Sequence, residues 1–342
     1  MSAFAIGGRA IGPGEPVFVV AEAADAHLGS LDTAKEMALQ AKLAGADAVK
    51  FQHHLPDEEM LRDVPMSDNF EEPLYDFLVR HALTLDQHAE LLGYCREIGI
   101  RYLCTPFSHA AARELDSIGV DSFKIGSGEL TDIPSLVKIA GLGHPMLVST
   151  GMATLEEIDE TVAALRETSV PLALMNCVSE YPPVYEDMNL RTIRVLQERY
   201  PDLPVGHSDH TPDLYTSFAA VTLGAHAIEK HVILDKRQPG PDQSVSVDMP
   251  ELHQLVGGIR KIEAALGSEK AVHEREAEIR AWAHRSVVSL QAIPAGATIA
   301  EEMVWTKRPG TGIPSKQLSE VIGRVAARDI EANALLSWDD LA

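Results

Sequence analysis

The chain has 342 residues, of which 45% are apolar, and its formal net charge at pH 7 is −22. This apolar content can build a large core, whereas so acidic a surface argues against a nucleic-acid partner and gives no reason to expect membrane binding. The three cysteines form no CxxC pair, no apolar run could span a bilayer, and the first residues lack a signal pattern. We therefore expect a soluble cytoplasmic protein without a disulfide framework or a structural zinc site.

Apolar runs and amphipathic segments alternate along most of the chain. The predicted strands cover residues 16–23, 48–51, 101–104, 122–125, 146–149, 172–176, 203–206 and 227–230. The predicted helices cover residues 31–44, 85–98, 110–118, 133–140, 155–166, 190–200, 213–224 and 250–266. Ser30 and Thr154 are the predicted N-caps of two of these helices. Residues 53–80 interrupt the alternation and predict a loop with short helical pieces.

This alternation predicts a (β/α)8 TIM barrel, because eight strand–helix units fill a length close to the roughly 250 residues typical of that fold. A doubly wound open sheet is the alternative, and we disfavour it because no GxGxxG turn follows the first strand. The tail is different, with short β segments among Gly/Pro-rich turns. We expect a barrel domain over residues 1–267, a linker helix over 268–285 and a small β-rich domain over 286–342.

Polar residues gather where the predicted strands end, which is where TIM barrels place their chemistry. They are Glu22, Lys50, Gln52, Thr105, Lys124, Ser127, Glu129, Ser149, Asn176, Ser179, Glu180, Tyr181, His207, Ser208, Asp209, His210, Glu229, Lys230 and His231. Lysines inside apolar strands are seldom buried without a partner, so Lys50 and Lys124 stand out. Together with nearby Gly/Ser turns they predict a cradle for a phosphate or carboxylate.

His210 and His231 follow two strands of one βαβ unit, so both should point from the same edge of the sheet. Two neutral imidazoles on a rigid scaffold predict a divalent-metal site. The alternative from spacing alone is that both are polar residues capping strand ends.

Seven short motifs carry a resemblance to a known family. They are Ala46–Gln52, Lys124–Leu130, Ser149–Thr154, Cys177–Pro182, Ser208–Thr211, Ile228–His231 and Pro239–Asp242. In this order they resemble the sialic acid synthases, which make N-acetylneuraminate, legionaminate and pseudaminate. Lys307–Ile313 resembles that family's antifreeze-like (SAF, β-clip) domain, so the resemblance covers nearly the whole chain.

The resemblance implies a transferase that condenses phosphoenolpyruvate with the open-chain aldehyde of an N-acylated amino hexose and releases phosphate. The acceptor would be N-acetylmannosamine or a 2,4-diacetamido-trideoxyhexose. A divalent ion would polarise the aldehyde oxygen, with manganese expected and magnesium or cobalt as alternatives. His210 and His231 would be its protein ligands.

The same resemblance assigns the other site residues. The implied catalytic residues are Lys50, Lys124 and Glu129, and the implied substrate-binding residues are Glu22, Gln52, Thr105, Ser127, Ser149, Ser179, Tyr181, Asp242 and Arg308. The lysines, Ser127 and Ser149 would hold the phosphate, Thr105 the carboxylate end, and Glu129 would handle a proton. Glu22, Gln52, Tyr181 and Asp242 would line the acceptor side. Arg308 would reach the partner subunit's sugar, which predicts a domain-swapped homodimer.

The chain departs from the family pattern in the loop after the first strand. Ala26 and Leu28 replace amide-bearing residues, Gln243 stands where His is frequent, and His207 stands where Tyr is common. Lost hydrogen-bond donors change substrate discrimination, so we expect a modified acceptor sugar. Two further interpretations stay open. One is another phosphoenolpyruvate-dependent aldol synthase, making octulosonate or heptulosonate phosphates, although those barrels lack a SAF-like tail. The other is a non-catalytic carbohydrate-binding or ice-binding homologue.

Overall fold

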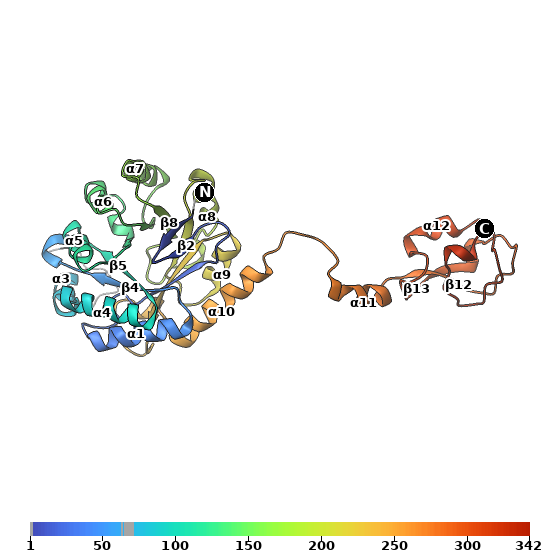
Figure 1. Ribbon diagram of the computed structural model, residues 1–342, viewed down its shortest axis with the longest axis horizontal. Helices are drawn as coiled ribbons and strands as arrows, with labels where there is room; N and C mark the ends of the chain where they lie inside the picture. The colour runs from blue at the N-terminus through green and yellow to red at the C-terminus, as the bar shows by residue number, and fades with distance from the viewer. Residues whose placement is uncertain (1–2, 63, 65–71) are drawn as a thin grey trace. The chain divides into compact units, whose positions relative to one another are not determined.

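The computed structural model describes residues 3–62, 64 and 72–342, and the chain divides into two compact units, Met1–Leu266 and Gly267–Ala342. In the first unit, eight parallel strands of the described residues form the barrel: β3 (Phe18–Glu22), β4 (Ala48–His53), β5 (Arg101–Pro106), β6 (Phe123–Ile125), β7 (Met146–Ser149), β8 (Leu172–Cys177), β9 (Val205–Asp209) and β10 (Ala227–Ile233). A two-residue strand, β11 (Val247–Asp248), pairs parallel with the end of β10. Strand β10 pairs with both β9 and β3, which closes the sheet into a barrel (Figure 1). The predicted TIM barrel is thus confirmed, and the open-sheet alternative is wrong.

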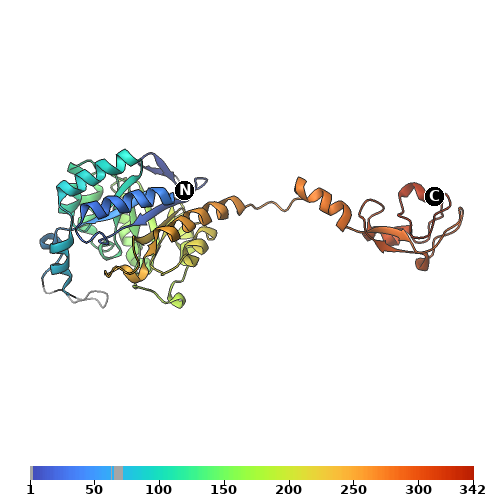
Figure 2. The same ribbon diagram turned by 90° about the horizontal axis from the view of Figure 1, so that it is seen from below.

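Helices surround this barrel on the outside (Figures 1 and 2). The helices that follow the strands are α1 (Leu31–Ala44), α4 (Leu85–Ile98), α5 (His109–Ser117), α6 (Ile133–Ala140), α7 (Leu155–Arg166), α8 (Thr192–Arg199), α9 (Tyr215–Thr222) and α10 (Met249–Ala265). Both predicted N-caps are confirmed, since Ser30 accepts from the backbone N–H of Thr33 and Thr154 accepts from that of Glu157. These caps satisfy free N–H groups and fix where each helix begins after its loop.

The short helical pieces predicted for residues 53–80 are confirmed in the described part of this segment. Helices α2 (Pro56–Glu59) and α3 (Leu74–His81) lie in this segment, while residues 63 and 65–71 fall outside the described part of the chain. Tyr75 and Leu78 of α3 are buried. Helix α3 is therefore packed onto the barrel and shapes the entrance to its carboxyl end.

The sequence did not lead us to predict an N-terminal hairpin. Strands β1 (Phe4–Ile6) and β2 (Arg9–Ile11) pair antiparallel through Gly7 and Gly8, whose positive φ angles of 51° and 77° suit a two-residue hairpin turn. Ile6 and Ile11 pack against the inward-facing residues Phe18, Val20, Ala48, Leu103, Leu147, Ala173, Met175 and Ala227. The hairpin therefore covers the amino end of the barrel and leaves the carboxyl end for the site.

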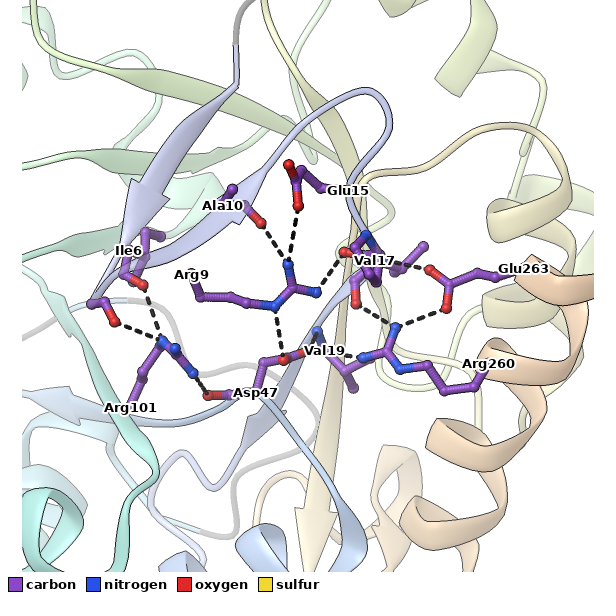
Figure 3. A network of polar contacts seen from close by, with 12 residues as sticks. Ile6, Arg9, Ala10, Glu15, Val17, Val19, Asp47, Arg101, Arg260 and Glu263 are labelled. Atoms are coloured by element: carbon purple, nitrogen blue, oxygen red, sulfur yellow. Dashed lines mark hydrogen bonds and ion pairs between the residues drawn. The ribbon is translucent and has the colours of Figure 1, made fainter.

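Asp47 ties the hairpin to the barrel (Figure 3). Its Oδ1 accepts from Arg9 at 3.3 Å, and its Oδ2 accepts from the Val19 backbone at 2.9 Å and from Arg260 at 3.0 Å. Arg101 donates to the Ile6 carbonyl at 3.1 Å. The partly buried Asp47 carboxylate thus links β2, β3 and α10 at the amino end of the barrel, opposite the carboxyl ends of the strands.

The second unit has its own small core. It contains α11 (Glu274–Ala283), β12 (Ser286–Ser289), β13 (Val304–Lys307) and α12 (Leu318–Val321). Its core residues are Val287, Ile293, Ile299, Val304, Ile313, Val321, Ala326, Ile330 and Leu336. Apart from the β12–β13 pair, its described β contacts are isolated bridges such as Ile293 with Ile330, because turns interrupt the chain every few residues. In the described residues we find no helix with the length and apolar content needed to cross a membrane.

Candidate functional site

The carboxyl ends of the strands surround a cavity of about 370 Å³. The barrel residues that the sequence placed at the site all line it: Glu22, Lys50, Gln52, Thr105, Lys124, Ser127, Glu129, Ser149, Ser179, Tyr181, His210, His231 and Asp242. They come from eight different strand ends or the loops that follow them. The closed barrel thus brings together residues that are up to 220 positions apart in the sequence (242 − 22).

Not every polar residue at a strand end reaches this cavity. Asn176, Glu180, His207, Asp209 and Lys230 do not line it, so the prediction that the strand-end polar residues gather at the site was wrong for them. Side chains alternate across a strand, and the four that belong to strands lie on the outward faces of β8, β9 and β10, while Glu180 lies in the loop after β8. Lys230 instead lies 3.3 Å from Asp209, and both side chains are 0% exposed. Asp209 also accepts hydrogen bonds from α9, so this pair fastens strand to helix.

The two strand lysines meet around one carboxylate. Glu229 Oε1 lies 3.0 Å from Lys50 Nζ and 3.6 Å from Lys124 Nζ, and it accepts from Ser208 Oγ at 2.9 Å. Burial alone would raise the pKa of Glu229, but the two ammonium groups lower it to about 2. Glu229 is therefore ionised at neutral pH and keeps both lysines at the cavity floor. The sequence showed Glu229 at a strand end but gave it no role.

Small residues allow the β6 and β7 loops to approach this floor. Lys124 Nζ donates to Ser149 Oγ at 2.6 Å, and Ser127 Oγ accepts from the Gly151 backbone at 3.1 Å. A Cβ at Gly151 would lie 2.7 Å from Ser127 Oγ, which is too close for any larger residue. Two ammonium groups, two hydroxyls and a backbone turn thus form a compact anion cradle.

Glu129 stands beside this cradle with an unsatisfied oxygen. It lies in the turn η1 (Ser127–Glu129), and its buried Oε2 has no hydrogen-bond partner. Burial raises the pKa of Glu129 to about 7, against a usual 4.5. A carboxyl group that titrates near neutral pH can both give and take a proton, which suits general acid–base chemistry.

His210 and His231 lie close together in the same cavity. Their ring centroids are 5.2 Å apart, and Tyr181 stacks on His210 at 4.3 Å. His210 Nδ1 donates to the Val178 carbonyl at 2.7 Å, which fixes the N–H on Nδ1 and leaves the Nε2 lone pair for another partner. Nε2 now accepts from the Tyr181 hydroxyl at 3.2 Å.

These two imidazoles fit a divalent ion that takes few protein ligands. In the part of the chain that the structure describes, no group of three or more His, Cys, Asp and Glu residues is arranged to hold a metal. Nδ1 of buried His231 has no hydrogen-bond partner, although Asp242 Oδ2 lies 3.5 Å away. An ion held by His210 and His231 would therefore keep open positions for water or substrate, as catalytic metal sites do.

Comparison with known proteins decides the family. The NeuB family model matches residues 37–271, and the SAF domain model matches residues 284–342. The chain belongs to the NeuB family. It is 36% identical to the N,N'-diacetyllegionaminic acid synthase of Legionella pneumophila over 336 residues, which is 95% of this chain and 94% of that protein.

Two solved structures support the same assignment for this NeuB chain. The crystal structure of the N-acetylneuraminic acid (sialic acid) synthetase of Leptospira borgpetersenii, in complex with citrate, has a TM-score of 0.75 at 30% identity, covering 81% of this chain and 95% of that one. The spore coat polysaccharide biosynthesis protein SpsE of Bacillus subtilis has a TM-score of 0.69 at 33% identity, covering 100% and 99%.

In this NeuB barrel the altered loop after β3 forms part of the cavity wall. Asp25 and Ala26 line the cavity, and Gln238 donates to the Ala26 carbonyl at 3.0 Å. Ala24 and Leu28 have positive φ angles of 45° and 48°, a conformation that Gly and Asn adopt more readily. Leu28 therefore adopts left-handed geometry without an amide side chain.

The cavity wall also holds residues that the sequence did not single out. Besides Asp25, these include His54, Phe107, Leu78 and Cys177. A period-two pattern along β4 could have indicated His54, because Lys50 and Gln52 precede it on the same face. Leu78 and Phe107 carry no such signal, since apolar residues in a helix and a loop read as core.

Arg308 belongs to the second unit of the chain. Its guanidinium lies 5.3 Å from the Trp282 ring centroid, and Nε donates to the Ala283 carbonyl at 3.1 Å. These contacts hold the side chain against α11 rather than leaving it free in solvent.

Proposed function

We propose that this chain is a nonulosonic acid synthase, which condenses phosphoenolpyruvate with an N-acylated amino hexose and releases phosphate. The observation that carries the proposal is one cavity, in a NeuB-family barrel, that holds both a lysine cradle and a pair of histidines. The relatives named as legionaminic acid and sialic acid synthases support the product class. The SAF match supports this activity over an octulosonate- or heptulosonate-phosphate synthase.

Lys50, Lys124, Ser127 and Ser149 would hold the phosphate of phosphoenolpyruvate. Both ammonium groups carry charge into a buried site, where electrostatic attraction is stronger than in water. Glu229 contacts both lysines and Glu22 contacts Lys50, so the phosphate would compete with these two carboxylates for the ammonium groups. Thr105, whose buried Oγ1 has no hydrogen-bond partner, would meet the carboxylate end.

Glu129 would move the proton that the condensation requires. Its pKa of about 7 and its position in the cavity lining support this role, since a carboxyl group of near-neutral acidity would lie beside the phosphoenolpyruvate held in the cradle. The rate gained by such proton transfer is typically about 10²–10⁴-fold.

His210 and His231 would hold a divalent ion, with manganese expected and magnesium or cobalt as alternatives. When bound, the ion would act as a Lewis acid on the acceptor aldehyde. Five residues would orient the sugar beside this ion: Glu22, Gln52, Ser179, Tyr181 and Asp242.

The charges around the cavity favour a neutral acceptor. Among the described residues, Lys50 and Lys124 are the only Lys or Arg side chains in the lining, and both contact Glu229. Four further carboxyl groups line the cavity, and when ionised they would repel a second phosphate: Glu22, Asp25, Glu129 and Asp242. We therefore infer an unphosphorylated amino sugar as the acceptor.

A phosphate-release screen tests this function. The purified chain, with manganese and phosphoenolpyruvate, is given N-acetylmannosamine, its phosphate ester, 2,4-diacetamido-trideoxyhexoses, and the pentose and tetrose phosphates that other synthases of this type would use. We expect turnover with an unphosphorylated acetamido sugar. Turnover only with the pentose or tetrose phosphate would overturn the assignment, and turnover with none of the panel would favour the non-catalytic interpretation.

A binding experiment tests the two histidines separately from turnover. Calorimetric titration with manganese should show at least about tenfold weaker binding for His210→Ala and for His231→Ala, since each removes one of two protein ligands. His144→Ala is the matched control, because His144 pairs with Asp116 and does not line the cavity. If both site variants bind manganese as tightly as the parent protein, the ligand assignment is wrong.

A further inference from the structure

His54 lies at the edge of the cavity in a polar cluster that the proposed mechanism does not use. It is the first residue after β4, it is 6% exposed, and it lines the cavity. Its ring stacks on Phe107, with centroids 4.3 Å apart and planes inclined by 16°. Because this stack fixes the orientation of the ring, the partners of its two nitrogens indicate the protonation state of His54.

Both ring nitrogens of His54 face hydrogen-bond acceptors. Nδ1 lies 2.9 Å from Glu59 Oε2, and Nε2 lies 3.0 Å from the amide oxygen of Gln52. Asp25 Oδ2 is a further acceptor, 3.6 Å from Nε2. A histidine that donates from both nitrogens carries a positive charge.

Glu22 determines which way the Gln52 amide points. Gln52 Nε2 donates to Glu22 Oε1 at 3.0 Å, while Lys50 Nζ lies 3.4 Å from the other carboxylate oxygen. Burial raises the pKa of Glu22, and Lys50 opposes that rise. Against an ionised Glu22, a turned amide would set its oxygen against the carboxylate, so the NH₂ group faces Glu22. The amide oxygen therefore faces His54, and the only compatible state of His54 is one that donates from Nε2.

We propose that His54 is a positioning residue: a protonated imidazole that holds Gln52 with its NH₂ group toward Glu22 and the acceptor sugar. The part of this inference that concerns the sugar rests on the proposed function. A neutral His54 that still donates from Nδ1 to Glu59 would present a lone pair at Nε2. The Gln52 amide would then turn, and its oxygen would face the Glu22 carboxylate.

The surroundings of His54 favour the charged ring. The facing carboxylates are Asp25 from the loop after β3, Glu59 from α2 and Glu129 from η1, against the imidazoles of His27, His53 and His88. Burial alone would lower the pKa of His54, but the carboxylates raise it above the usual value. The flat stack on Phe107 adds a cation–π contact.

The protonation state can be measured without turnover. Nitrogen-15 NMR of histidine-labelled protein, with the His54 signals assigned through their loss in His54→Leu, should show both ring nitrogens protonated at about pH 8. An ordinary histidine, with a pKa of about 6.5, is neutral there. A neutral His54 at that pH would overturn the proposal. This result does not depend on which reaction the protein catalyses, so it separates failure of this inference from failure of the proposed function.

Kinetics test the positioning role. His54→Leu should raise the acceptor KM about tenfold, as expected for one misdirected hydrogen bond, with the phosphoenolpyruvate KM changing less than about twofold. His53→Leu is the matched control, because His53 is equally buried but binds Glu114 and does not line the cavity. An equal rise in acceptor KM for both variants would mean that the effect comes from the loss of any buried histidine and not from the contact between His54 and Gln52.

A double-mutant cycle shows whether His54 acts through Gln52. In a Gln52→Leu background the amide is gone, so His54→Leu should add no further increase in acceptor KM. Full additivity of the two changes would contradict the proposal, since it would mean that His54 affects the sugar by another route.

Discussion

Two buried lysine–carboxylate contacts in this barrel have opposite roles. Lys50 and Glu229 face the cavity, where the Lys50 ammonium group can turn from Glu229 toward an incoming anion. Lys230 and Asp209 lie on the outer faces of β9 and β10, where no substrate can reach them. Sequence position alone does not separate the two, because all four residues lie near the strand ends. Only the direction of the side chain decides which lysine is available for chemistry.

The raised pKa of Glu129 means that its ionisation at neutral pH lowers the stability of the folded protein. We expect Glu129→Gln to stabilise the protein above about pH 7, by about 3.5 kcal/mol at most, because the shift from 4.5 to about 7 is 2.5 pKa units and each unit corresponds to about 1.4 kcal/mol. The folded state holds a proton up to a pKa of about 7, whereas the unfolded chain releases it near 4.5. Between these values the stability of the parent falls as pH rises, and glutamine removes that loss.

Unfolding free energies measured from about pH 4 to pH 8 check this prediction. The difference between Glu129→Gln and the parent should be small at the acid end and grow through pH 7, while phosphate release drops. Glu97→Gln, which changes an exposed carboxylate on α4, should give a flat difference. A constant stabilisation by Glu129→Gln at every pH would mean that charge burial is not the cause.

At the level of elements, the sequence predicted what depends on local chemistry. The helix starts at Ser30 and Thr154 follow from capping, and the buried strands follow from continuous apolar runs. Lys50 and Lys124 could be identified as site residues because a lysine in such a run is unusual. Nothing local indicated that Asn176 and Lys230 point outward, since a fully buried parallel strand has no polar face to set its register.

The missed elements depend on contacts between distant segments. The β1–β2 hairpin is short, and it is held by the barrel interior and by Asp47 rather than by its own length. The role of His54 depends on Glu59, Gln52 and Glu22, whose relation appears only when β3, β4 and α2 meet. The Gly7-Gly8 turn was the one local signal for the hairpin.

Asp47 allows a test of how strongly the polar contacts between the hairpin and the barrel stabilise the fold. We expect Asp47→Ala to lower the unfolding free energy by about 2–3 kcal/mol, because it removes the acceptor of the Val19 N–H and one of the acceptors of Arg9 and of Arg260. Urea unfolding measures the change. Activity per folded molecule should be unchanged, since Asp47 precedes β4 and lies at the end of the barrel opposite the cavity.

Asp202→Ala is the control for this prediction. Asp202 also accepts from an arginine, Arg166, but both side chains are about half exposed, at 56% and 46%. Such a surface pair contributes about 0–1 kcal/mol. Equal destabilisation by the two variants would show that the hairpin network is no stronger than an ordinary surface ion pair.

At the scale of the whole molecule, the second unit carries Arg308, the one predicted site residue outside the barrel. It has its own core, and Arg308 is held between Trp282 and the end of α11. This arrangement presents a cation on a rigid support, at low cost in side-chain entropy. The domain-swapped homodimer, in which Arg308 completes the site of the other subunit, remains a prediction from the family resemblance.

Mixing two defective variants tests that prediction. Arg308→Ala lacks the arginine, and Lys124→Met lacks a cradle lysine, so each homodimer should release little phosphate. If Arg308 acts across the dimer, each mixed dimer contains one site with both residues intact. Random exchange makes half of the dimers mixed, so about a quarter of all sites should regain full activity. If Arg308 acts within its own chain, every site in a mixed dimer still carries one lesion, and mixing should restore nothing. Subunit exchange, checked by mass spectrometry of differently labelled chains, ensures that a lack of recovery reflects site geometry rather than dimers that never mixed.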